Sequence, residues 1–190
     1  MFARPIASLA ALAIALPLAA APVFAAGGGS SGGSSGGTSG GSSGPSPAVQ
    51  CKKGQVYDKR KKKCMLPGRA AIDDDSLYDA GRALAMAGRY DEAISILSFA
   101  NDKTDPRILN YLGYSHRKAG RVLVGLGYYQ EALRNDPDYT LVREYLGEAH
   151  LQLGNVAAAR AELAEIEKRC GKSCSEYGEL EAEIHAYVKG

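Results

Sequence analysis

The pattern of apolar and small residues between residues 74 and 189 predicts a series of short amphipathic helices. Apolar side chains recur there at helical spacing, and glycines follow them at regular intervals. One set of glycines recurs at steps of 32 and 34 residues, at Gly81, Gly113 and Gly147. A second set repeats the same steps and would close the first helix of each unit, at Gly88, Gly120 and Gly154. We therefore predict three helical hairpins, each built from two helices of about 13 residues.

The same registers predict how the two helices of a hairpin pack. The first set of glycines has no side chain to hold a neighbouring helix away. Small residues recur in phase on the second helices, at Ala93, Gly125 and Ala159, and larger apolar residues follow them at Leu97, Tyr129 and Leu163. Asp105-Pro106 and Asp136-Pro137 fall between units, the first as a helix cap with proline in the first turn. Close packing of paired helices is therefore expected.

These motifs resemble the tetratricopeptide repeat family. The resemblance rests on Tyr111-Leu112-Gly113-Tyr114 with Gly120, on the segment 128–133 with Asp136-Pro137, and on the segment 88–94. It implies an all-α fold, an α–α superhelix of three repeats within residues 72–174, whose concave groove is lined by the first helix of each hairpin and binds proteins or peptides. The chain departs from the family pattern where a bulky aromatic is usual, at Leu77, Leu109 and Arg143, and its first unit is two residues short.

Residues 175–190 predict one further helix. Tyr177, Leu180, Ile184 and Val188 fall at helical spacing, and glutamates occupy other positions. A stack of repeats must end in an element with a polar outer face, so we interpret this segment as a capping helix.

Repeat phase also predicts which side chains line the groove. They are Tyr78, Arg82, Arg107, Asn110, Tyr114, Arg117, Lys118, Glu144 and Glu148. The middle hairpin combines cations, an amide and an aromatic ring, which suits a carboxylate or an acidic peptide. An ordinary solvated helix face is the alternative. We expect Arg117→Glu to spare folding and to weaken partner binding.

The N-terminal segments have a different character. Residues 1–26 carry one basic residue, a short apolar run from Ile6 to Leu16 and an end rich in small residues, which predicts a cleaved signal peptide and a periplasmic or secreted protein. An uncleaved membrane anchor is the alternative, but Ser8, Pro17 and Pro22 argue against it, so we expect no transmembrane span in the mature chain. Residues 27–48 are almost entirely glycine and serine, as in a disordered linker.

Four cysteines form an even set, at Cys51, Cys64, Cys170 and Cys174. In an exported chain this favours two disulfides, and we predict that each cysteine pairs with its near neighbour, because short loops close at least entropic cost. A zinc site is the alternative, but the spacings are unusual for one. The first bond would close a small basic hairpin over residues 49–67.

Positive charge is concentrated in that hairpin. Residues 51–69 hold eight basic side chains and one acidic one, including the run Lys59, Arg60, Lys61, Lys62 and Lys63, whereas residues 70–190 hold 14 basic and 20 acidic groups. The basic run could contact an anionic envelope polymer or membrane surface, or it could lean on the acidic helical domain. Nucleic acid is an unfavoured partner, because no aromatic residues are interleaved with the cations.

The residues carry no pattern that is diagnostic of an enzyme. We find no nucleophile with a base, no phosphate loop and no metal-ligand spacing, so we expect no catalytic residue, cofactor or metal. The prediction is an exported scaffold that binds a protein partner in its groove. The alternative is an envelope-binding protein held to an anionic surface by the hairpin.

Overall fold

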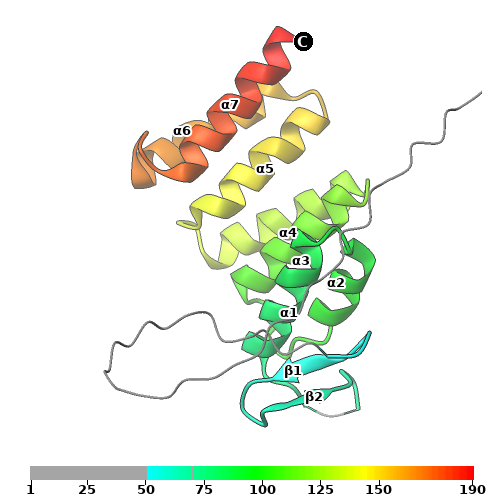
Figure 1. Ribbon diagram of the computed structural model, residues 1–190. Helices are drawn as coiled ribbons and strands as arrows, with labels where there is room; N and C mark the ends of the chain where they lie inside the picture. The colour runs from blue at the N-terminus through cyan, green and yellow to red at the C-terminus, as the bar shows by residue number, and fades with distance from the viewer. Residues whose placement is uncertain (1–50, 70) are drawn as a thin grey trace, which may run out of the picture. The chain divides into compact units, whose positions relative to one another are not determined.

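The computed structural model describes residues 51–69 and 71–190, which form two strands and seven helices (Figure 1). Their bounds are β1 Val56–Asp58, β2 Lys63–Met65, α1 Asp74–Met86, α2 Tyr90–Leu97, α3 Pro106–Lys118, α4 Val122–Asn135, α5 Thr140–Gln152, α6 Val156–Cys170 and α7 Ser175–Lys189. The predicted signal peptide, the predicted linker and the first two residues of the predicted hairpin lie outside the described residues.

The three predicted hairpins are present as the pairs α1–α2, α3–α4 and α5–α6, stacked in chain order. The same turn joins the helices of every pair. Gly88, Gly120 and Gly154 have φ angles of 75°, 82° and 76°, a left-handed conformation that glycine adopts without steric cost. The N–H of the next residue then donates back to a carbonyl of the first helix, as from Arg89 to Leu84 at 2.9 Å.

Small residues bring the helices of the middle hairpin together. A Cβ atom placed on Gly113 would lie 2.7 Å from the Tyr129 ring and 3.1 Å from the Gly125 carbonyl oxygen. In the third hairpin, the closest neighbour of such an atom on Gly147 would instead be Leu180, on α7. The predicted contact between a first-helix glycine and the small residue in phase on the second helix thus holds in α3–α4. In the first hairpin such an atom on Gly81 would meet the Leu97 side chain first, and the glycine of α5 makes room for the capping helix.

Helix α2 is shorter than predicted, with eight residues instead of about 13. The chain leaves the helix after Leu97, and the backbone N–H groups of Asn101 and Asp102 each donate to the Asp74 carboxylate at 2.8 Å. Because these two N–H groups donate to Asp74 at the start of α1, they do not donate to carbonyl groups of α2, and the helix does not continue. The first unit, two residues shorter than the second, therefore ends in a turn.

Non-repeat elements cover both ends of the stack. Helix α7 packs on α5 and α6 and buries Tyr177, Leu180 and Ile184, as predicted, but Val188 is 57% exposed near its last turn. At the other end β1 and β2 form an antiparallel hairpin, with Tyr57 opposite Cys64. This hairpin lies against α1 and places Val56 in the core of the first unit.

Both disulfides join near neighbours, as predicted. Cys51 pairs with Cys64 across the β-hairpin, and Cys170 pairs with Cys174 between α6 and α7.

Within the part of the chain that the structure describes, no helix is long and apolar enough to cross a lipid bilayer.

Candidate protein-binding groove

The first helices of the three hairpins present a row of tyrosine rings. Tyr78 on α1 lies 5.7 Å from Tyr111 on α3, measured between ring centroids, and Tyr111 lies 6.2 Å from Tyr114. Tyr114 in turn lies 5.1 Å from Tyr145 on α5. Edge-to-face and tilted pairs of this kind stabilise aromatic clusters beyond the area that they bury. The row therefore fixes the relative positions of the three helices whose side chains were predicted to line the groove.

Arg117 lies at the centre of this row and connects α3 to α5. Its guanidinium is 2.7 Å from the Glu148 carboxylate, and its Nε donates to the Tyr129 hydroxyl at 3.3 Å. The charged group also lies over the rings of Tyr114 and Tyr145, 5.6 and 5.7 Å from their centroids. A buried cation with one carboxylate partner and two aromatic faces is a structural connector between repeats.

Three predicted groove residues are buried instead of facing the solvent. Asn110 is 0% exposed, Arg117 2% and Glu144 3%. The expectation that Arg117→Glu would spare folding is therefore corrected, because the new carboxylate would be buried beside Glu148. Neither polar side-chain atom of Asn110 has a hydrogen-bond partner among the described residues. Its amide is therefore buried without a hydrogen bond to replace those that it would make with water.

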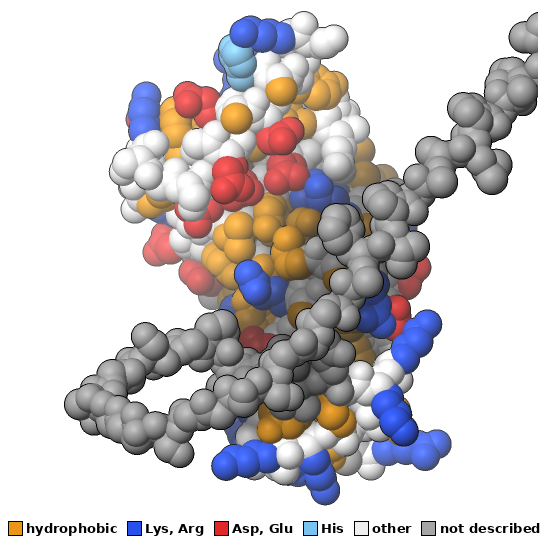
Figure 2. Space-filling model, in the orientation of Figure 1, with side chains coloured by type: hydrophobic (Ala, Val, Ile, Leu, Met, Phe, Trp, Pro, Cys, Tyr) orange, Lys and Arg blue, Asp and Glu red, His pale blue; other side chains and the backbone are white. Residues whose placement is uncertain are grey.

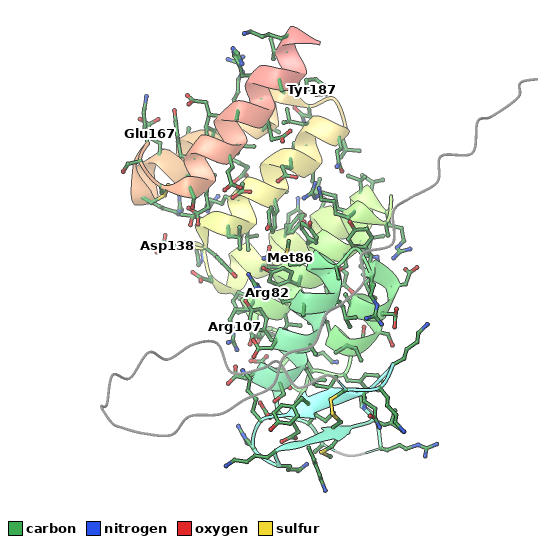
Figure 3. The ribbon with its side chains drawn as sticks, viewed as in Figure 1. Arg82, Met86, Arg107, Asp138, Glu167 and Tyr187 are labelled. Atoms are coloured by element: carbon green, nitrogen blue, oxygen red, sulfur yellow. A yellow bond between two sulfur atoms is a disulfide. The ribbon has the colours of Figure 1, made fainter. Side chains whose placement is uncertain are left out.

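Other predicted groove residues are accessible on this face. Arg82 and Lys118 are exposed, and Tyr78 and Tyr114 are partly buried. Figure 3 shows Arg82, Met86 and Arg107 on the face that α1 and α3 present to the viewer. Arg107 is held by two carboxylates, those of Asp105 and Asp75, at 2.7 and 2.9 Å. Much of the predicted positive charge is thus already neutralised within the protein.

The far end of this face is acidic. Figure 2 shows Asp and Glu side chains gathered over α5 and α7. Burial raises the pKa of Glu144 to about 8, and the neighbouring carboxylates of Glu179, Glu148 and Glu176 add to the effect. Arg117 partly offsets this charge through Glu148. The face therefore runs from exposed cations on α1 and α3 to surplus carboxylates on α5 and α7.

Sequence reasoning missed Tyr111 and Tyr145 as members of the row. A compositional signal was present, because the chain has 11 tyrosines but only three phenylalanines and no tryptophan. Tyrosine supplies an apolar ring and a polar hydroxyl at once, which suits a surface that is half buried. The preference for tyrosine over the other aromatic residues, together with its place on all three first helices, could have identified the row.

The predicted basic run divides into two groups. Lys59 forms an ion pair with Asp79 on α1, and Lys61 donates to the Ala71 carbonyl and lies 3.7 Å from Asp58. Arg60, Lys62 and Lys63 are exposed and form no ion pair within residues 51–69 and 71–190. Part of the run thus leans on the helical domain, and part faces the solvent.

Two further features of the described residues lie away from this face. A cleft of about 940 Å³ lies between β1 and the α1–α2 hairpin, with Val56, Leu84 and Ile96 among its walls. Cys170, Cys174 and Glu176 lie close enough to share a metal, but both sulfur atoms are in the disulfide, which leaves one carboxylate.

The described helices form a superhelix of stacked helical hairpins. Residues 111–173, from α3 into the turn after α6, match the tetratricopeptide repeat family model.

Solved structures agree on the fold. The first repeat domain of human RPAP3 is 17% identical, with a TM-score of 0.55 over 61% of this chain and 92% of that one. PcrH in complex with the chaperone binding region of PopB is 23% identical, with a TM-score of 0.51 over 60% and 93%. The Yersinia enterocolitica chaperone SycD with a peptide of the translocator YopD is 20% identical, with a TM-score of 0.52 over 60% and 88%. No curated protein matches the sequence.

Proposed function

We propose that this chain is a scaffold that binds a peptide or a helical segment of a protein partner along the face of α1, α3 and α5. The observation that carries the proposal is the row of tyrosine rings, partly exposed at Tyr78, Tyr114 and Tyr145, beside the exposed cations Arg82 and Lys118. Tyrosine is enriched in protein interfaces because one ring combines a large contact area with a hydrogen-bonding group.

The similar structures support this proposal through what they contain. SycD is solved with a translocator peptide, PcrH with a segment of PopB, and a repeat domain of RPAP3 with an HSP90 peptide. The row of rings on α1, α3 and α5 is the surface on which this chain would hold such a segment, so the function that we propose is binding.

Crosslinking in intact cells tests the proposal. A photoreactive residue replaces Arg82 or Lys118 on the groove face, and Gln130, exposed on α4, provides the matched control. We expect one protein to be captured from the groove positions only.

A binding measurement with that protein, once purified, provides a second test. The double variant Arg82→Glu with Lys118→Glu should weaken binding at least tenfold. The double variant Arg160→Glu with Lys168→Glu, which changes the charge equally on α6, should not. Equal capture from Gln130, or unchanged binding by the groove variant, would overturn the proposal.

We also propose that the protein works after export. The composition of residues 1–26 and the even set of cysteines support this, because disulfides persist in oxidising compartments. Replacing Leu12 and Ile14 by arginine should abolish processing of the precursor. Mass spectrometry of the mature chain should find its first residue near Gly27, and an intact N-terminus at Met1 in the wild type would contradict export by this route.

A further inference from the structure

The β-hairpin and its connection to α1 carry a surface that the groove does not use. Six cations there are exposed and form no ion pair with any described residue; they are Lys52, Lys53, Arg60, Lys62, Lys63 and Arg69. We call them the free cations. Figure 2 shows Lys and Arg side chains projecting around this end of the molecule.

The chain itself offers these cations little neutralisation. Residues 1–50 contain no aspartate or glutamate, so the preceding segment cannot pair with them. Carboxylates beside the hairpin are already engaged: Asp79 with Lys59, Asp58 with the Lys61 backbone N–H, Asp73 with Ser76, and Glu92, close to Lys53, with Arg89. The hairpin therefore presents uncompensated positive charge to an external partner.

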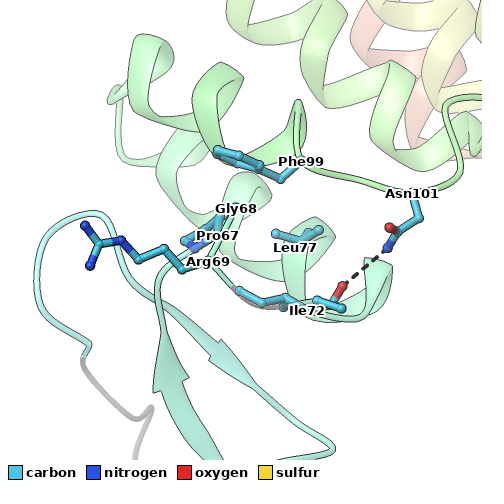
Figure 4. Close-up of a pocket in the computed structure, with 8 residues that line it drawn as sticks. Pro67, Gly68, Arg69, Ile72, Leu77, Phe99 and Asn101 are labelled. Atoms are coloured by element: carbon cyan, nitrogen blue, oxygen red, sulfur yellow. Dashed lines mark hydrogen bonds between the residues drawn. The ribbon is translucent and has the colours of Figure 1, made fainter.

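Two apolar side chains protrude beside the free cations. Leu66 is 40% exposed directly after β2, and Phe99 is 45% exposed after α2. Figure 4 shows Phe99 next to Pro67 and Gly68, with Arg69 extending away from them. Because Lys61 donates to the carbonyl of Ala71, which lines the same pocket as Phe99, the basic turn is held close to this apolar spot. Cations near exposed apolar side chains are typical of surfaces that enter the headgroup region of a membrane.

We propose that the hairpin binds the surface of an anionic phospholipid bilayer, with the free cations at the headgroups and with Leu66 and Phe99 inserted shallowly. The Cys51–Cys64 disulfide keeps Lys52 and Lys53 beside the strand that carries Lys63. A partner that supplies charge alone would leave the two apolar side chains in water, whereas a bilayer satisfies both features.

Vesicle sedimentation tests this proposal. The test uses a shortened chain that begins at Gly27, because the apolar run at Ile6–Leu16 would bind lipid by itself. This shortened chain retains Pro45–Gly190, which forms one compact unit. We expect binding to vesicles that contain phosphatidylglycerol and none to pure phosphatidylcholine. Each cation near an anionic leaflet contributes about a fivefold gain in affinity, so Arg60→Ser, Lys62→Ser and Lys63→Ser together should weaken binding on the order of 100-fold.

A matched variant separates this site from net charge. Arg160→Ser, Lys172→Ser and Lys189→Ser remove the same charge from α6, α7 and the turn between them, and binding should stay within about threefold of the wild type. Leu66→Ser with Phe99→Ser should lower the binding that persists at high salt. Equal losses from both charge variants, or equal binding to both kinds of vesicle, would overturn the proposal. Tight binding to soluble polyphosphate without vesicle binding would overturn it in favour of a polymeric anion.

Discussion

The helical stack and the β-hairpin use basic side chains in opposite ways. In the stack, Arg107, Arg117 and Arg143 each face carboxylates, and Arg117 is buried between two repeats. In the hairpin, Lys59 pairs with Asp79 on α1 and Lys61 donates to the Ala71 carbonyl, while Arg60, Lys62 and Lys63 face the solvent. The comparison teaches that the arginines paired within the stack fix structure, whereas most of the exposed charge of the hairpin, like that of Arg82 and Lys118 on the stack, is available for a partner.

The largest effect is expected for Arg117→Glu. The new carboxylate would lie buried beside Glu148 without a cation, and breaking a buried ion pair typically costs about 3–5 kcal/mol. Urea unfolding followed by circular dichroism measures the free energy of unfolding. Lys118→Glu, the exposed neighbour, should change it by less than about 0.5 kcal/mol. Equal effects of the two variants would show that Arg117 is not a connector.

The second largest loss of stability is expected for Gly113→Leu. Its side chain would collide with the Tyr129 ring and the Gly125 carbonyl, and such overpacking typically costs about 1–3 kcal/mol. Gly127 is the matched control, since a Cβ atom there meets nothing within 4 Å. Gly127→Leu should keep or raise the melting temperature, because leucine favours helix more than glycine does. An unchanged melting temperature for Gly113→Leu would contradict the packing assigned to α3–α4.

The burial of Glu144 predicts that the free energy of unfolding depends on pH, with an effect of intermediate size. Its pKa is about 8 in the folded protein and near 4.5 when exposed, so the folded state binds the extra proton between these values. The contribution of Glu144 to stability should therefore be greatest below pH 4.5 and should be lost as the pH rises to about 8, by at least about 1–2 kcal/mol. Glu144→Gln should flatten this part of the profile, and Glu181→Gln, exposed on α7, should not. Because the lowered pKa of His116 contributes in the opposite direction, the comparison is made between the two proteins, and equal slopes for the wild type and Glu144→Gln would refute the assignment.

The smallest effect on stability belongs to the hairpin. Replacing Arg60, Lys62 and Lys63 by serine should change the free energy of unfolding by less than about 0.5 kcal/mol, because exposed cations without partners contribute little. Thermal unfolding checks this value against the wild type. A destabilisation of more than about 1 kcal/mol would mean that these residues hold the fold, as Lys59 and Lys61 do, and the contrast between the two regions would fail.

Much of the fold could be predicted because its rules are local or periodic. Gly88 closes α1 by its own backbone conformation, and Gly113 signals close packing through its recurrence in phase. The end of α2 could not be predicted in this way. It depends on Asp74, which is 27 residues away from Asn101 in the chain, and a contact of that range leaves no periodic trace.

For the candidate site, the sequence predicted which helices carry the residues but not how deeply each residue is buried. Repeat register placed Arg82, Lys118 and Arg117 on the first helices, yet only the first two are exposed. The burial of Arg117 follows from the rings of Tyr114 and Tyr145, which close over it from two different repeats. The phase of a residue in the repeat predicts the side of its own helix on which it lies, whereas its exposure depends on the side chains that the next hairpin packs against that side.

Covering both ends has a consequence for the size of the stack. Val56 seals the outer side of the first hairpin, and Leu180 fills the space above Gly147 in the last one. A fourth unit would have to displace either a disulfide-closed ribbon or a docked helix before it could add. Within the described residues, both faces on which a further unit could stack are therefore already covered.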